Sequence, residues 1–219
     1  MFNVSRPAEA PKSLAERRSY SEEDVLNKLR EIFYDKCYLC EIKDPTSINV
    51  EHFYAHQGNL DKKFDWNNLF YVCGRCNNIK LAKYNNLLDC TNNDVDVFRL
   101  IKQLPPHTPY QSKIIIEPMA ADDKTIETAD LLDEIFNTEK TINKKITGKY
   151  LRKKVFHKYN RFLELVNEYL DDELPQERKD EALVRLQVLM SRKQEFSAFI
   201  RWVVLEDEYL HELLGNSID

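Results

Sequence analysis

Two Cys-x-x-Cys pairs constrain the fold of this chain more than any other feature of its sequence. The first pair is Cys37 and Cys40, and the second is Cys73 and Cys76. Two pairs at such a spacing are typical of a tetrahedral zinc site with four thiolate ligands. A redox-active pair or two short-range disulfides are the alternatives, and we disfavour both because redox motifs rarely occur as a matched pair. The fifth cysteine, Cys90, is expected to be a small buried hydrophobic residue.

The composition excludes several classes of function. No stretch of the sequence approaches the roughly 18 apolar residues of a membrane span, and its first residues lack the apolar segment of a secretory signal. We therefore expect a cytoplasmic protein with no membrane contact, in a compartment where structural disulfides are rare. The 219 residues include only four glycines, which excludes a Gly-rich phosphate loop. A net charge of −5 decides little about nucleic acid, because the charge is unevenly spread along the chain.

Apolar periodicity around the cysteine pairs predicts a short α+β segment. Residues 21–34 have helical spacing, and residues 48–53 alternate between apolar and polar side chains as a half-buried strand does. Residues 54–67 are predicted to form a loop, residues 69–72 a second strand and residues 77–88 a short helix. The expected order is therefore strand, loop, strand, zinc knuckle and helix.

The two ends of the chain have a different character. Residues 1–19 are polar, contain two prolines and lack periodicity, which predicts an extended arm. Residues 91–120 are expected to be irregular, with one brief strand at residues 113–117. Three apolar stripes at helical spacing follow, and they predict helices over residues 151–170, 183–190 and 196–214.

A basic run covers residues 140–161, in which no acidic residue occurs. A solvated helix face is the simplest interpretation. The alternatives are a phosphate-contacting patch and a docking surface for an acidic partner. The basic residues of the run are Lys140, Lys144, Lys145, Lys149, Arg152, Lys153, Lys154, Lys158 and Arg161.

Polar residues around the zinc frame suit phosphodiester hydrolysis. This reaction needs a base, and neutral His52 can take a proton from water near pH 7. It also needs a hard divalent cation, for which Glu51 and Asn77 could each supply one oxygen ligand. These two residues lie at opposite ends of the expected hairpin, so a zinc ion at its base brings them together. Neighbouring strand residues face opposite ways, so Glu51 and His52 act side by side only where the strand twists or ends.

The order Glu-His, Asn-Leu and Cys-x-x-Cys-Asn-x-x-Lys, after an earlier Cys-x-x-Cys, resembles the HNH endonucleases of the ββα-metal type. The resemblance covers residues 37–84 and implies that His52 is the general base. It also implies that Glu51 and Asn77 bind the catalytic metal and that Asn68 holds the loop that positions the base. Glutamate replaces the commoner aspartate before the base, and asparagine replaces the commoner histidine at the third position. An oxygen ligand there favours Mg²⁺ or Mn²⁺ over zinc.

A narrower resemblance extends to more of the chain. The runs Val-Glu-His-Phe and Asp-Trp-Asn-Asn-Leu, an Arg-Pro arm and the helical C-terminal half resemble the PtuB family. These are HNH nucleases of Septu-type anti-phage systems, some of them linked to retrons. The resemblance implies an ATPase partner of the PtuA type that holds and regulates the nuclease. It also implies DNA as the default substrate, with the helical half docking the ATPase or a second copy of the chain in a homodimer.

We therefore expect an α+β fold with a small zinc-pinned HNH core, an N-terminal helix and a mainly α-helical C-terminal half. The expected parts are an arm and helix at residues 1–35, the nuclease core at residues 36–90, and a linker with a helical domain at residues 91–219.

Positive side chains near the core are predicted to contact nucleic acid, and these are Arg75, Lys80 and Lys83. His56 lies in the predicted loop, where solvent exposure is favoured over contact with a phosphate. Two other functions stay open. A zinc-knuckle module that binds nucleic acid or protein without cutting predicts no metal-dependent cleavage. A thiol redox protein predicts reversible thiol oxidation and no stoichiometric zinc.

Overall fold

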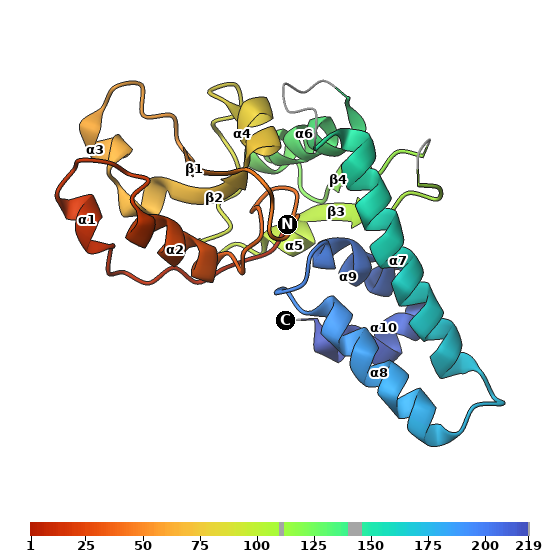
Figure 1. The fold of residues 1–219 in the computed structure, drawn as a ribbon. Helices are drawn as coiled ribbons and strands as arrows, with labels where there is room; N and C mark the ends of the chain where they lie inside the picture. The colour runs from red at the N-terminus through yellow and green to blue at the C-terminus, as the bar shows by residue number, and fades with distance from the viewer. Residues whose placement is uncertain (110–111, 140–145, 219) are drawn as a thin grey trace.

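The computed structural model describes residues 1–109, 112–139 and 146–218. Its class is α+β, as predicted: the described residues form helices and two small antiparallel sheets, β1–β2 and β3–β4. Figure 1 shows the N-terminal part of the chain around the first hairpin, with α7 leading away to the remaining helices. Within the described ranges, no helix combines the length and the apolar character that a membrane span requires.

The centre of the N-terminal part is a hairpin followed directly by a helix. β1 (Ile48–His52) pairs with β2 (Leu69–Cys73), so that Ile48 lies opposite Cys73 and His52 opposite Leu69. α4 (Gly74–Lys80) follows β2 and contacts both strands. Both predicted strands are confirmed. The predicted helix over residues 77–88 is wrong at both ends, because α4 starts at Gly74 and ends where Leu81 adopts a φ of 42°.

The segment between the strands is more ordered than the predicted loop. It contains α3 (Leu60–Lys63), which is capped by the Asn59 side chain, and the short 3-10 helix η1 (Trp66–Asn68). The Asp65 side chain accepts a hydrogen bond from the backbone N–H of Asn67 and so caps η1. These two short helices give a defined shape to the second half of the segment that joins β1 to β2.

The N-terminal arm packs into the core. Residues 1–11 are extended as predicted, whereas the short α1 (Lys12–Ala15) was not predicted. Met1, Phe2 and Val4 are buried. Arg6 donates hydrogen bonds to the carbonyl oxygens of Trp66 and Leu69, at 2.8 Å each, and so ties the arm to η1 and β2.

The predicted helix over residues 21–34 is α2 (Glu23–Ile32). It ends earlier than predicted because Tyr34 and Asp35 both have positive φ angles, of 55° and 58°. Residues in this left-handed region stop a helix and turn the chain, here into the first cysteine pair.

The region over residues 91–120 contains more structure than its sequence indicates. α5 (Val97–Leu100) leads into β3 (Ile101–Leu104), which pairs with β4 (Ile115–Pro118). The brief predicted strand corresponds to β4. Its partner β3 was missed because four residues that include a buried Gln103 carry too little apolar alternation.

The predicted helices of the C-terminal half are confirmed. They are preceded by α6, and the third apolar stripe is divided in two because Asp207 caps the next helix. Lys140, Lys144 and Lys145 of the basic run lie outside the described residues, and the rest of the run lies in or next to α7. The elements are α6 (Asp123–Asn137), α7 (Gly148–Leu170), α8 (Gln176–Met190), α9 (Ser197–Glu206), α10 (Glu208–Leu214) and η2 (Gly215–Ser217).

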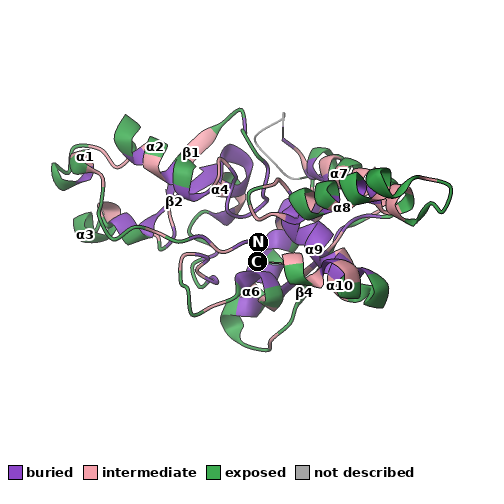
Figure 2. Cartoon of the chain, turned by 90° about the horizontal axis from the view of Figure 1, so that it is seen from below, coloured by how far each residue is buried: buried purple, intermediate pink, exposed green. Residues whose placement is uncertain are grey.

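Two main apolar clusters hold the molecule together. The larger one joins the arm, α2, the hairpin, α6 and the first half of α7, and it reaches Phe199 on α9. The second lies between α8, α9, α10 and the second half of α7. Figure 2 shows buried residues over β2, α4 and α9. One core thus includes residues from all three predicted parts of the chain.

Candidate zinc centre and hydrolytic site

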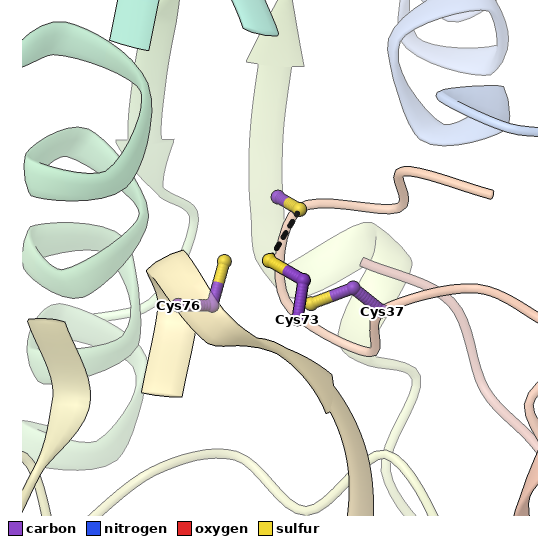
Figure 3. Close-up of side chains that lie close together, drawn as sticks. Cys37, Cys73 and Cys76 are labelled. Atoms are coloured by element: carbon purple, nitrogen blue, oxygen red, sulfur yellow. Dashed lines mark hydrogen bonds between the residues drawn. The ribbon is translucent and has the colours of Figure 1, made fainter. Parts of the chain in front are cut away.

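The four cysteines of the two pairs form one buried cluster. Their Sγ atoms all lie within 4.8 Å of one another, and the Sγ atoms of Cys40 and Cys73 are 3.8 Å apart. Figure 3 shows the sulfur atoms of Cys37, Cys73 and Cys76 gathered in one place. A tetrahedral zinc ion with Zn–S bonds of about 2.3 Å places its ligands about 3.8 Å apart. All four thiols are free, so the cluster fits a zinc ion and not two disulfides.

Backbone hydrogen bonds bring the two pairs together. The first pair lies in a knuckle that is closed by a bond from the N–H of Cys37 to the carbonyl of Ile42, at 3.0 Å. The N–H of Tyr38 donates to the carbonyl of Tyr71 at 3.1 Å and so attaches this knuckle to β2. The N–H of Gly74, between the second pair, donates to the carbonyl of Ser47 at 3.0 Å and so ties the start of α4 to the segment before β1.

His52 ends β1 at the opposite end of the hairpin from the cysteines. Its Nε2 atom lies 3.0 Å from the carbonyl oxygen of Lys63. A carbonyl can only accept, so Nε2 carries the hydrogen in the neutral ring and Nδ1 keeps its lone pair. Burial lowers the pKa of His52 and outweighs the hydrogen bond to the Lys63 carbonyl, which raises it, while the nearby charge of His56 lowers it further. The ring is therefore a neutral base at pH 7, with Nδ1 as the accepting atom.

Asn68 holds together the two ends of the segment from Tyr54 to Lys62, which follows His52. Its buried side chain accepts a hydrogen bond from the N–H of Tyr54 at 2.7 Å. It donates to the carbonyl oxygens of Tyr54 and Lys62, both at 2.9 Å. Tyr54 follows His52 closely, and Lys62 precedes the carbonyl that anchors the histidine ring. Asn68 thus lies where it can fix the loop around the base.

Replacing Asn68 by alanine is expected to lower the free energy of unfolding by about 2 kcal/mol, because the N–H and carbonyl of Tyr54 and the carbonyl of Lys62 all lose their partner. Hydrogen exchange at the amide of Tyr54 should become faster. Asn67→Ala is the matched control, since the Asn67 side chain is exposed. Equal stability of the two variants in urea unfolding would contradict this role of Asn68.

Glu51 points away from His52, as strand alternation requires. Its buried Oε1 atom accepts a hydrogen bond from the hydroxyl of Tyr38 at 2.5 Å and lies 3.3 Å from Lys80 Nζ. Lys80 also donates to the carbonyl oxygens of Phe53 at 2.9 Å and His52 at 3.3 Å. Burial raises the pKa of Glu51 to about 7, although Lys80 opposes the shift. The Lys80 ammonium is therefore enclosed by three oxygens at the end of β1.

Asn77 lies one helical turn before Lys80 and so occupies the same face of α4. It is half-buried, and the described contacts include none between its side chain and Glu51. Carboxylate and amide oxygens are ligands that suit a hard cation, and Glu51 already holds one cationic group. In this structure, however, Glu51 is buried and its Oε1 atom is already engaged by Tyr38 and Lys80.

Two of the residues that were predicted to contact nucleic acid are buried. Arg75 is fully buried and donates to the carbonyl oxygens of Ile135 at 2.8 Å and Thr138 at 2.7 Å, at the end of α6. Lys80 is 2% exposed. The prediction is wrong for both residues, because their side chains end on backbone carbonyls inside the protein. Only Lys83 of the three is exposed, and it pairs with Glu134 at 2.7 Å.

Lys80→Met is expected to destabilise the protein by roughly 3 kcal/mol, because it removes the buried ammonium that pairs with Glu51 and donates to two backbone carbonyl oxygens. Methionine keeps most of the apolar part of the lysine side chain, so the loss of stability measures the contribution of the ammonium group. Lys83→Met is the matched control on the surface and should leave the urea midpoint unchanged. A Lys80→Met midpoint equal to that of the wild type would show that the buried pair contributes nothing.

His56 is a residue whose surroundings the sequence did not reveal. Its ring lies 4.6 Å from that of His52, and the ring of Tyr20 lies 4.5 Å from His52. Both contacts are edge-to-face. His56 is half-buried, which corrects the prediction of solvent exposure. No residue pattern indicated this, because the contact depends on how the loop folds back over the end of β1.

Comparison with known proteins gave no match among protein-family models, curated proteins or solved structures. The functional interpretation therefore depends on the geometry of the two centres at the ends of the hairpin.

Proposed function

We propose that this chain is a metal-dependent endonuclease that hydrolyses phosphodiester bonds in nucleic acid, with DNA as the default substrate. The observation that carries the proposal is the state of His52. Its Nε2–H is anchored on the carbonyl of Lys63, burial lowers its pKa, and Nδ1 is left as a base. This is the arrangement that deprotonation of an attacking water molecule requires.

Each residue of the site has a distinct role in this proposal. Nδ1 of His52 takes the proton from water, and the Lys63 carbonyl stabilises the imidazolium that forms. Asn68 keeps the loop and the base in place. A Mg²⁺ or Mn²⁺ ion held by Glu51 and Asn77 would stabilise negative charge on the phosphate. The cysteine-bound zinc holds the hairpin closed and takes no part in the reaction.

We further propose that the nuclease works beside an ATPase in an anti-phage defence complex. The sequence contains no Gly-rich phosphate loop, so ATP hydrolysis would come from another chain. The helical half also exposes apolar side chains one turn apart on α8, with Val184 58% and Val188 52% exposed. These two exposed valines support a contact surface on α8 for the ATPase or for a second copy of this chain.

The direct test is cleavage by the purified protein, alone and with an ATPase of the PtuA type. Supercoiled plasmid and total RNA are incubated with Mg²⁺, Mn²⁺ or EDTA. We expect cleavage of plasmid with Mg²⁺ or Mn²⁺ and none in EDTA. Oligonucleotide binding without cleavage under every condition would instead support a non-catalytic zinc-knuckle module.

A further inference from the structure

We propose that His56 is a second substrate-contacting residue, whose Nε2–H donates a hydrogen bond to a phosphate oxygen of the nucleic acid next to His52. The inference rests on the proposed function for the identity of the ligand. It concerns a residue that has no part in the roles described above.

The two histidine rings form one unit. Their centroids are 4.6 Å apart, and their planes are inclined by 62°. A group that approaches His52 from this side therefore also meets His56. The contact joins the last residue of β1 to the loop that follows it, so both rings border the same end of the hairpin.

Hydrogen bonding assigns the same tautomer to the two rings, with the hydrogen on Nε2, but it engages a different nitrogen in each ring. The N–H of Gly58 donates to Nδ1 of His56 at 3.1 Å, so Nδ1 holds a lone pair and the ring hydrogen is on Nε2. In His52 it is Nε2 that is engaged, because it donates to the Lys63 carbonyl, and Nδ1 is the nitrogen left open. Within the described part of the chain, neither His52 Nδ1 nor His56 Nε2 forms a hydrogen bond. The pair thus offers one acceptor and one donor.

This combination matches the two groups that meet in phosphodiester hydrolysis. The acceptor serves the water that loses a proton, and the donor serves a negatively charged phosphate oxygen. A hydrogen bond to a charged oxygen also needs a donor that is held in place before the substrate arrives.

The loop around His56 provides that order. The N–H of Asn59 donates to the His56 carbonyl at 2.7 Å, and the N–H of Ala55 donates to Asn85 Oδ1 at 2.8 Å. Gly58 has a φ of 86°, a conformation that lets its N–H turn back to the His56 ring. The loop is therefore tied on both sides of His56 before any ligand binds.

Two substitutions separate hydrogen-bond donation from simple packing. His56→Phe keeps an aromatic ring against His52 but has no donor. His56→Gln loses the ring but places an amide N–H near the position of Nε2. We expect His56→Phe to slow cleavage by about 10- to 100-fold, the range for a lost hydrogen bond to a charged group, and His56→Gln to recover most of that loss. The same two changes at His157, an exposed histidine on α7, are the matched controls.

Binding measured without added Mg²⁺ or Mn²⁺, and without a chelator that would remove zinc, gives a readout that does not depend on catalysis. The affinity for a fluorescent DNA oligonucleotide, measured by anisotropy, should fall in His56→Phe and be restored in His56→Gln. If the wild type binds in this His56-dependent way but never cuts, the inference on His56 stands and the nuclease proposal fails. Wild-type cleavage and binding in His56→Phe would overturn the inference, as would equal losses in both variants. A wild type that neither cuts nor binds would overturn both proposals.

Discussion

Replacing His52 by alanine is expected to abolish metal-dependent cleavage while the fold and the zinc content stay unchanged. The substitution removes the atom that accepts the proton from water, and a positioned general base accelerates such reactions by about 100- to 10,000-fold. The ring is only half-buried and makes one hydrogen bond, to the Lys63 carbonyl, so the loss of stability should be small. Initial rates on supercoiled plasmid, with Mg²⁺ or Mn²⁺, measure the effect.

His157→Ala is the matched control for this experiment, because it removes an exposed imidazole far along the chain on α7. It should cut at the wild-type rate. Circular dichroism and zinc content of His52→Ala confirm that the variant is folded. Cleavage by His52→Ala at the wild-type rate would rule out this residue as the base.

Replacing Cys73 by serine is expected to remove the zinc ion and to destabilise the whole N-terminal part of the molecule. The four buried thiols lie where the first knuckle, β2 and α4 meet, so a zinc ion bound there would cross-link these segments. Structural zinc sites contribute on the order of 10 kcal/mol in small domains, which exceeds the net stability of most proteins. Metal analysis and thermal unfolding should therefore show loss of bound zinc and a much lower Tm, or an insoluble product.

Cys90→Ala is the control that distinguishes loss of a zinc ligand from loss of any buried cysteine. Cys90 is equally buried but lies outside the cluster, so this variant should keep one zinc ion per chain and lose about 1 kcal/mol. If Cys73→Ser retained zinc with an unchanged Tm, the four-thiolate site would be excluded.

The hairpin connects the two centres. Its register puts Cys73 opposite the first residue of β1 and Leu69 opposite His52, so the cysteine cluster and His52 lie at its two ends. A zinc ion in the cluster would fix the end of β2 and the start of α4, and α4 in turn carries Lys80 to the carbonyl oxygens of His52 and Phe53. Loss of zinc should for this reason also disturb the base, although the metal is not next to it.

The sequence by itself determined the zinc frame, the two strands of the hairpin and the main helices of the C-terminal half. Each of these depends on short-range patterns: paired thiols, alternation of apolar side chains, and apolar stripes at helical spacing. The resemblance to HNH endonucleases indicated Asn68, which ends η1 directly before β2 and whose side chain binds both Tyr54 and Lys62.

Only the tertiary structure decided which charged side chains face solvent. Arg75, Lys80 and Lys83 look alike in the sequence, yet Arg75 ends on α6 carbonyls and Lys80 on Glu51, whereas Lys83 is exposed. The contact between His52 and His56 and the pairing of β3 with β4 were also beyond sequence reasoning. The physical reason is the same in each case. Burial and pairing depend on segments that meet only after folding, and a local pattern of residues carries no information about them.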